Sequence, residues 1–220
     1  MRFLLTLLLL AIASGCSPGR DEVENAVKSE LPRPKYVTFE GFQYFNNDTV
    51  CGQYMGLDVM GDMHGFRPFI YAPSWVDVNP GKVDIYIFCS NEQAKRLQER
   101  YSFSIANEDV SNYIKIKGDF ETLDRAISVY IETHKTLPAS LEELVNSNTA
   151  RENSVSVDEL QAATLDPWGY AYHYKGNGWG GVSLDYDLCT HGANGESGGG
   201  NIDKNICKTD LKYFSILINL

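Results

Sequence analysis

The residues with the clearest chemical pattern form a glycine-rich loop near the C-terminal end. Five of the nine residues from 192 to 200 are glycine, and Cys189 and Cys207 flank the segment. Glycine adopts positive φ at little steric cost, so such a loop can turn its backbone carbonyls inward. Asp203 and Asn205 follow closely. Oxygen ligands of this kind suit a hard cation, so the segment predicts a cation-binding nest and not a catalytic pocket.

The first 15 residues predict a signal peptide. A basic start precedes an apolar run over residues 3–12, interrupted only by Thr6. About ten residues are too few to cross a bilayer, which takes about 20. Residues 13–15 are small and precede Cys16, which resembles the lipobox of bacterial lipoproteins. The resemblance implies cleavage before Cys16 and lipid on its sulfur and amine. The alternative is an ordinary signal peptide with an incidental cysteine.

The residue after the predicted lipid site points to a compartment. In lipoproteins a residue other than aspartate at this position, here Ser17, favours the outer membrane. The resemblance therefore implies a lipid-anchored protein of the cell envelope that faces the periplasm. Several acyl chains would make a durable anchor, because each buried methylene contributes about 0.8 kcal/mol.

Four cysteines remain once Cys16 is set aside, and an even number in an exported protein indicates disulfides. Three pairings are possible. We expect Cys51–Cys89 and Cys189–Cys207, because each pair lies within one predicted domain. Four buried free thiols are the alternative. The sequence contains no CxxC or HxxxH spacing, so a zinc site is not expected.

Composition limits the partners. The chain has 220 residues and a formal net charge of −10, and nucleic acid is not expected to bind because phosphates need the opposite sign. An apolar content of 43% is enough for a real core. Residues 16–34 are charged and carry three prolines, which predicts a tether with a short helical piece over residues 22–31.

A small α+β domain is predicted over residues 35–108. Strands are expected at 36–45, from 49 onward, at 69–71 and at 83–89, where β-branched and aromatic residues concentrate and the last run alternates at its start. Residues 46–48 predict a turn and residues 91–100 a helix. His64, Asp62 and Ser74 lie near one another in sequence without a nucleophile elbow or paired base, so no catalytic residue is expected.

The second predicted domain spans residues 109–220. An apolar stripe over residues 120–131 predicts a helix capped by Asp119, and Ser140 has the capping-box pattern for a short helix over residues 141–145. A polar loop is expected at residues 146–156 and a turn at 166–169. Strands at 170–174 and 182–188 flank a glycine-rich turn at 175–181 and lead into the glycine loop.

This order of residues resembles the globular domain of the major pseudopilin of type II secretion systems, over roughly residues 115–206. The specific part is the Asp-Pro-Trp-Gly turn at 166–169 together with the glycine loop. The residues that carry the resemblance are Leu123, Ala126, Tyr130, Leu137, Pro138, Tyr172, Tyr174, Thr190, His191, Gly192, Ala193, Asn194, Gly195, Gly198, Gly199 and Ile206. It implies a helix followed by a small antiparallel sheet and the loop. The fold class expected for the whole chain is α+β, with two small domains.

In the pseudopilin family the loop binds calcium. The family's two acidic positions correspond to Asn194 and Asn205, and Thr190 stands at the hydroxyl position. Amides carry no charge, which lowers calcium affinity, although Asp203 and Glu196 could compensate. The resemblance implies calcium held by Thr190, Asn194, Asp203 and Asn205. The alternative is that the Cys189–Cys207 disulfide has replaced the metal.

Pilins assemble through an apolar N-terminal helix, which this chain replaces with a lipobox and an additional domain. We therefore expect a structural or protein-binding role linked to type II secretion, and no enzymatic activity. The expected partners are the membrane, through the lipid anchor, and secretion-system or other envelope proteins. A free-standing ligand- or glycan-binding lipoprotein is the alternative.

Overall fold

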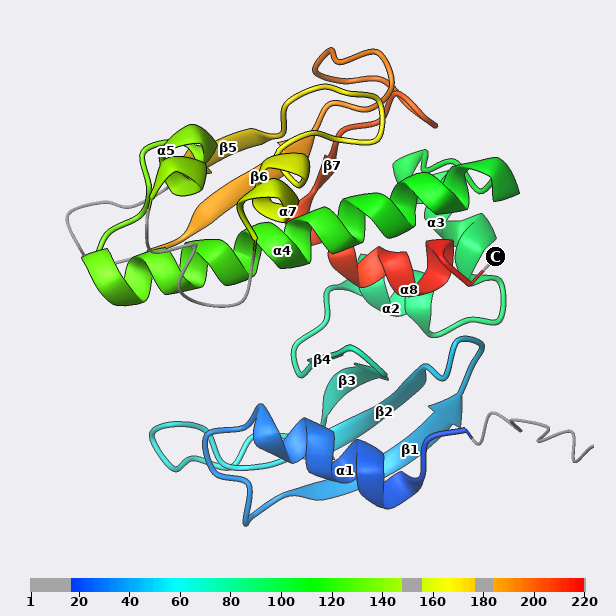
Figure 1. Cartoon of the computed structure of the whole chain (residues 1–220). Coiled ribbons are helices and arrows are strands. Elements are labelled where there is room, and N and C mark those ends of the chain that lie inside the picture. Colours follow the sequence, from blue (N-terminus) through cyan, green and yellow to red (C-terminus); the bar gives the residue numbers. More distant parts are fainter. Residues whose placement is uncertain (1–16, 148–155, 177–183, 220) are drawn as a thin grey trace, which may run out of the picture.

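The computed structural model describes residues 17–147, 156–176 and 184–219. Figure 1 shows a first unit at the bottom, in which helix α1 (Arg20–Ser29) lies on a four-stranded sheet, and a second unit above it, built around the long helix α4 (Val110–His134). This arrangement confirms the predicted α+β class. The predicted signal peptide and Cys16 lie outside the described residues, as do most of the predicted loop at 146–156 and of the turn at 175–181.

The first sheet contains three strands that the sequence predicts and one that it does not. β1 (Thr38–Tyr44), β2 (Val50–Met55), β3 (Arg67–Ala72) and β4 (Trp75–Asp77) form an antiparallel meander in that order. Asn47 and Asp48 have positive φ in the predicted turn between β1 and β2, a conformation that these short polar side chains tolerate. Gly41, with φ of 68°, lies where the register between β1 and β2 shifts.

Part of the segment predicted as a tether packs against this sheet. Helix α1 (Arg20–Ser29) covers one face, and Val23 and Val27 are fully buried against a cluster that includes Phe39, Phe69 and Tyr71. The Tyr71 hydroxyl also donates to a Glu22 carboxylate oxygen at 2.7 Å. The folded body therefore begins at Arg20, well before the predicted start of the first domain.

The predicted strand over residues 83–89 is wrong. The segment forms helix α2 (Lys82–Phe88), which buries Ile87 and Phe88 completely. Asp84 lies in its first turn, where the helix dipole favours an acidic residue. The Asp84 carboxylate also accepts hydrogen bonds from Lys212 Nζ at 2.9 Å and the Tyr213 hydroxyl at 3.0 Å. These partners are more than 120 residues away, so the local apolar alternation could not reveal the helix.

The long helix begins earlier than the sequence predicts. α4 runs over Val110–His134 and follows a 3-10 turn, η1 (Asn107–Asp109). Asp119 is therefore inside the helix and does not cap it, which corrects the prediction. The buried stripe extends upstream with the same spacing, because Tyr113 and Ile116 precede Phe120, Leu123 and Ile127.

The remaining elements surround α4. Helix α3 (Gln93–Tyr101) confirms the helix predicted from residue 91, and α5 (Leu141–Asn146) confirms the short helix after Ser140, whose side chain accepts from the Glu143 amide. Helix α7 (Val157–Ala162) was not predicted. The second sheet consists of β5 (His173–Gly176), β6 (Tyr186–Thr190) and β7 (Ile206–Cys207), all antiparallel. The chain closes with η2 (Lys208–Tyr213) and α8 (Phe214–Leu217).

The hydrophobic core crosses the predicted domain boundary at residue 108. One cluster joins Phe88, Leu97 and Phe103 to Phe120 and Phe214, so α2 and α3 pack with the C-terminal elements. Cys51 and Ile70 of the first sheet reach the same cluster. The first sheet is thus held between α1 on one face and α2 on the other.

Candidate functional site

Both predicted disulfides are present. Cys51–Cys89 joins β2 to the end of α2 with a Cα–Cα distance of 5.9 Å, and Cys189–Cys207 joins β6 to β7 at 4.0 Å. Cys189 and Cys207 are direct register partners in the second sheet. The second bridge therefore closes the base of the glycine loop, which leaves β6 and returns at β7.

The glycine loop depends on backbone conformations that other residues avoid. Gly192 has φ of 77° and Gly199 has φ of 86°. A Cβ on Gly192 would lie 2.6 Å from the Asp203 carbonyl carbon, and one on Gly199 would lie 2.5 Å from the Asp203 oxygen. Backbone packs against backbone here, which explains why glycine is required at these two positions.

Three of the four predicted calcium ligands have hydrogen-bond partners within the protein. The Asn194 Oδ1 accepts from the Glu196 amide at 3.0 Å, and the Asn205 Oδ1 accepts from the Gly198 amide at 2.9 Å. Thr190 is 1% exposed and its hydroxyl donates to Asp166. The side-chain oxygens of these three residues thus help to hold the loop and the adjoining turn.

No group of three or more His, Cys, Asp or Glu side chains comes together in a metal-binding arrangement within the described part of the chain. Among the four predicted ligands only Asp203 is acidic. Calcium affinity depends on ligand charge, so a set with a single carboxylate would bind the ion weakly. Calcium binding stays a prediction.

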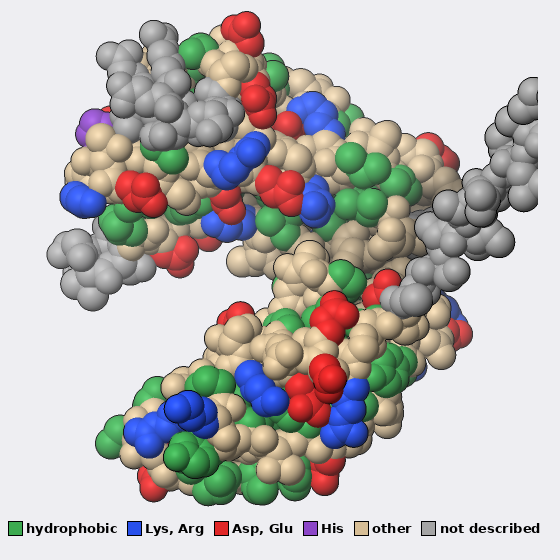
Figure 2. Space-filling model, turned by 60° about the horizontal axis from the view of Figure 1, so that its bottom comes forward, with side chains coloured by type: hydrophobic (Ala, Val, Ile, Leu, Met, Phe, Trp, Pro, Cys, Tyr) green, Lys and Arg blue, Asp and Glu red, His purple; other side chains and the backbone are tan. Residues whose placement is uncertain are grey.

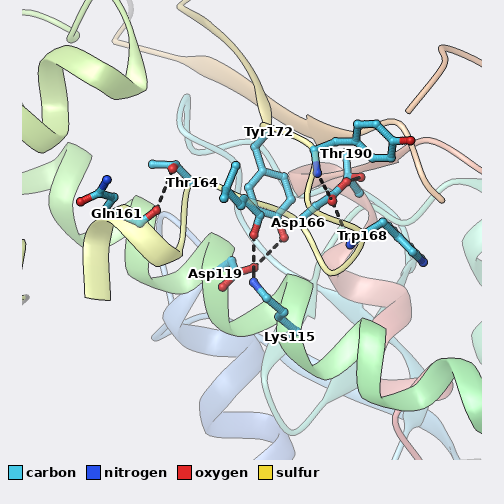
Figure 3. Close-up of polar contacts among 10 residues, drawn as sticks. Lys115, Asp119, Gln161, Thr164, Asp166, Trp168, Tyr172 and Thr190 are labelled. Carbon is cyan, nitrogen blue, oxygen red and sulfur yellow. Dashed lines mark hydrogen bonds and ion pairs between the residues drawn. The ribbon is translucent and has the colours of Figure 1, made fainter. Parts of the chain in front are cut away.

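The Asp-Pro-Trp-Gly turn is held by its aspartate (Figure 3). Asp166 is 3% exposed, and its Oδ1 accepts from the backbone amides of Trp168 at 3.0 Å and Tyr170 at 2.9 Å. Its Oδ2 accepts from the Thr190 hydroxyl at 2.5 Å. A single carboxylate therefore shapes the turn and attaches it to β6 at the base of the glycine loop. The motif predicts the turn, but nothing local in the sequence reveals the bond to Thr190.

A second carboxylate attaches the same region to α4. The Asp119 Oδ2 accepts from the Tyr172 hydroxyl at 2.7 Å and from Lys115 Nζ at 2.6 Å (Figure 3). Lys115 Nζ also donates to the Leu165 carbonyl at 2.9 Å. Burial raises the pKa of Asp119, although the bonds from Lys115 and Tyr172 oppose that effect. Burial and the neighbouring Asp119 raise the pKa of Tyr172.

Exposed apolar side chains border this polar network. Leu165 and Tyr170 are each 45% exposed and Ile202 is 39% exposed, and we call these three residues the turn–loop face. The Tyr170 ring lies directly against Gly195, where a Cβ would come within 2.6 Å of it. The turn and the glycine loop thus lie against each other where Tyr170 meets Gly195.

Over residues 17–147, 156–176 and 184–219, none of the helices combines the length and the hydropathy needed to cross a bilayer.

The C-terminal half of the chain is similar to a known protein family. A search of curated proteins gives no match. Residues 104–209 match the family model described as type II secretion system (T2SS), protein G. The matched segment contains α4, the second sheet, the Asp166 turn and the glycine loop. The pseudopilin family is structural and not catalytic. The C-terminal half of this chain therefore resembles protein G of the type II secretion system, the major pseudopilin.

Proposed function

We propose that this chain is a lipid-anchored protein of the cell envelope whose pseudopilin-like half binds proteins of a type II secretion apparatus. The observation that carries the proposal is the family match over residues 104–209, on a domain with a helix, a small antiparallel sheet and a glycine loop in the expected order. The family's structural role supports a binding or scaffolding function without catalysis.

The surroundings of α4 favour a role beside the filament and not within it. In pilins the corresponding helix continues upstream as the apolar filament core. Here α4 begins at Val110, and the residues before it fold into α3 and η1. The Tyr113 hydroxyl donates to the Ser104 carbonyl at 2.8 Å, and the Ser104 hydroxyl donates to Asp109. The start of α4 is therefore enclosed by its own chain.

The structure leaves little length between the predicted anchor and the folded body. Helix α1 begins at Arg20, so residues 17–19 are all that separates it from Cys16. Four extended residues reach about 14 Å at most. A lipid on Cys16 would hold the first unit close to the bilayer surface. Ser17 favours the outer membrane, and the protein would face the periplasm.

Two measurements test this function separately. The intact mass of the membrane-extracted protein tests acylation: a chain that begins at Cys16 and carries acyl groups supports the anchor, and an unmodified chain rejects it. Secretion of a type II substrate tests the role. A strain without this chain should secrete less, and the wild-type gene should restore secretion. Normal secretion in that strain would reject a necessary role in the apparatus.

The alternative, a ligand- or glycan-binding lipoprotein, has one observation in its favour. Half of the residues that line a cavity of about 640 Å³ have amide side chains, which can bond sugar hydroxyls. They are contributed by Asn46, Asn47, Asn91, Gln93 and Asn219. Saturable sugar binding that Asn219→Ala abolishes, with no secretion defect, would favour this alternative.

We also propose that the glycine loop keeps its shape without calcium. The Cys189–Cys207 disulfide and the amide acceptors of Asn194 and Asn205 supply the restraint that an ion would give. An equal melting temperature in excess calcium and in chelator is expected, because an ion that binds only the native state would raise it.

A further inference from the structure

Two histidines meet at the edge of the second sheet. His173 is the first residue of β5, and its direct register partner on β6 is Cys189. His191 is the residue after β6, and its ring stacks on that of His173 with a centroid distance of 5.6 Å and an interplanar angle of 28°. The two residues are far apart in the sequence, so the spacing of histidines along the chain could not reveal the pair.

Both rings lie on the face of the sheet that turns away from α4. On β6 the Tyr186 hydroxyl donates to a carboxylate of α4 and Leu188 is fully buried, so these alternate positions face the helix. Side chains alternate along a strand, which places Cys189 and its partner His173 on the opposite face. His173 is exposed and His191 is partly exposed, so both rings are open to ions in the solvent.

The backbone beneath the pair is fixed. β5 pairs with β6 from His173 to Gly176, and Cys189 is joined to Cys207 of β7 by a disulfide. His173 lies opposite one end of that bridge, and His191 lies two residues beyond the same end. The two histidines therefore need little ordering when they bind a ligand together, which lowers the entropic cost of binding.

Neither ring is used elsewhere in the described fold. Over residues 17–147, 156–176 and 184–219, the rings of His173 and His191 make no hydrogen bond or ion pair, and each contacts the other. A neutral imidazole has one nitrogen with a free lone pair, and this nitrogen is a preferred ligand of zinc, copper and nickel. The pair thus offers two nitrogen ligands.

The distance between the rings suits a shared metal ion. A zinc–nitrogen bond of about 2.0–2.1 Å places the centre of an imidazole ring about 3.2 Å from the metal. Two rings at the tetrahedral angle around one zinc ion then have their centres about 5.2 Å apart. The observed 5.6 Å exceeds this distance by about 0.4 Å, which small rotations about the side-chain bonds can close.

The charge beside the pair is balanced, so the ring nitrogens must supply the selectivity. The next register pair on the same face, Lys175 with Asp187, carries one charge of each sign. Figure 2 shows acidic side chains mixed with basic ones over the visible surface of both units, in a protein whose net charge is −10. Such a surface attracts cations in general. Calcium and magnesium prefer oxygen ligands, whereas imidazole favours zinc, copper and nickel.

We propose that His173 and His191 together bind a divalent transition-metal ion of the zinc, copper and nickel group, through one nitrogen of each ring. Water fills the remaining coordination positions. This site is distinct from the predicted calcium site in the glycine loop, whose ligands are oxygen atoms. The inference does not depend on the proposed role in secretion, because metal binding is measured on the purified protein.

The test uses the purified mature chain with both disulfides formed and with Cys16→Ser, which removes the fifth cysteine as a competing thiol. Calorimetric titration with zinc chloride measures the affinity, and electron paramagnetic resonance of added Cu²⁺ counts the nitrogen ligands. His173→Asn and His191→Asn should each weaken zinc binding about tenfold or more. Each substitution should also remove one nitrogen coupling from the copper spectrum.

His64→Asn is the matched control. The His64 side chain is 42% exposed, and its Nε2 bonds Asp58 at 2.7 Å and not Asp62, which is nearer in the sequence. This variant also removes an exposed imidazole, but one that has no second histidine beside it in the described structure. It should leave both the zinc affinity and the copper spectrum unchanged.

Three results would overturn the proposal. The first is a wild-type chain that binds no zinc, or whose zinc binding neither His173→Asn nor His191→Asn weakens. The second is an equal loss in His64→Asn, which would assign the ion to the loop between β2 and β3. The third is displacement of zinc by excess calcium, which would place the ion among the oxygen ligands of the glycine loop. Because both histidines lie on the surface, the variants should melt at the wild-type temperature without metal, which shows that they are folded.

Discussion

Removal of the loop disulfide gives the sharpest test of how the glycine loop is held. Cys189→Ser with Cys207→Ser opens a bridge with a sequence separation of 18. The loop-entropy relation gives a loss of about 3 kcal/mol in the free energy of unfolding. For a chain of this size that loss lowers the melting temperature by about 6–12 °C. Both cysteines are partly exposed, so the serine hydroxyls can reach water and add little to the cost.

The assay is thermal unfolding followed by circular dichroism, in chelator and in excess calcium. We expect the double serine variant to lose the same amount in both, because Asn194 and Asn205 remain bonded to the Glu196 and Gly198 amides. Cys51→Ser with Cys89→Ser is the matched control. Its separation of 38 predicts a loss of about 4 kcal/mol that calcium cannot restore.

Two outcomes would refute this reasoning. A loss below about 1 kcal/mol for the Cys189 and Cys207 variant would mean that the bridge does not hold the loop. Restoration of its stability by calcium, without an effect on the Cys51 and Cys89 variant, would mean that the loop binds the ion as the family resemblance implies.

Five further substitutions test the packing and the pKa shift of Asp119. Asp166→Ala removes the acceptor of two backbone amides and of the buried Thr190 hydroxyl, so the free energy of unfolding in urea should fall by about 3 kcal/mol or more. A loss below about 1 kcal/mol would contradict the role of Asp166 in holding the turn. Gly192→Ala should lower the free energy of unfolding by about 3 kcal/mol or more, and Gly198→Ala by only about 1–2 kcal/mol. Both glycines have positive φ, but of the two only Gly192 would place a Cβ against backbone atoms, so equal losses would exclude the clash. Val27→Ala should lower the free energy of unfolding by about 2 kcal/mol, because α1 buries Val27 against the first sheet. An unchanged free energy of unfolding would mean that this segment is a tether. The raised pKa of Asp119 favours the native state at low pH, and this contribution is lost as pH rises above the ordinary value of 3.8. The melting temperature of Asp119→Asn minus that of the wild type should therefore increase from pH 3 to pH 7. The same difference at both pH values would mean that the pKa of Asp119 is not raised.

Local sequence patterns were enough to predict several strands, turns and helices. Strands β1 and β2 of the first sheet carry β-branched and aromatic runs, and the turn at Asn47 and Asp48 has the residues that such a turn needs. Helix α7 could also have been found, because Ser156 and Glu159 have capping-box spacing and the Ser156 side chain accepts from the Glu159 amide.

Two other elements are set by contacts that no local pattern contains. Residues 83–88 alternate like a strand, but Asp84 bonds Lys212 and Tyr213 at the other end of the chain, and helix α2 buries Ile87 with Phe88. Gly118 and Asp119 look like the start of a helix, yet Asp119 is used by Tyr172. In both cases the tertiary partner overrides the local signal.

In the candidate site, too, the local motifs could be predicted from the sequence and the long-range contacts could not. The turn motif and the glycine loop were recognisable in the sequence, and both cysteine pairings are confirmed. The bond from Thr190 to Asp166 was not predictable, because it joins residues 24 apart through the tertiary fold. It gives Thr190 a structural role, because its hydroxyl joins the turn to β6, whereas its predicted role as a metal ligand stays a prediction.

The most direct test of the proposed role is photo-cross-linking in intact cells that secrete a type II substrate. A cross-linker at Tyr170, on the turn–loop face, should capture a protein of the type II secretion system, and one at Asn219, beside the amide-lined cavity, should not. Capture of secretion proteins only from Tyr170 is the predicted result. No secretion protein from either position, while the strain secretes normally, would contradict the central claim.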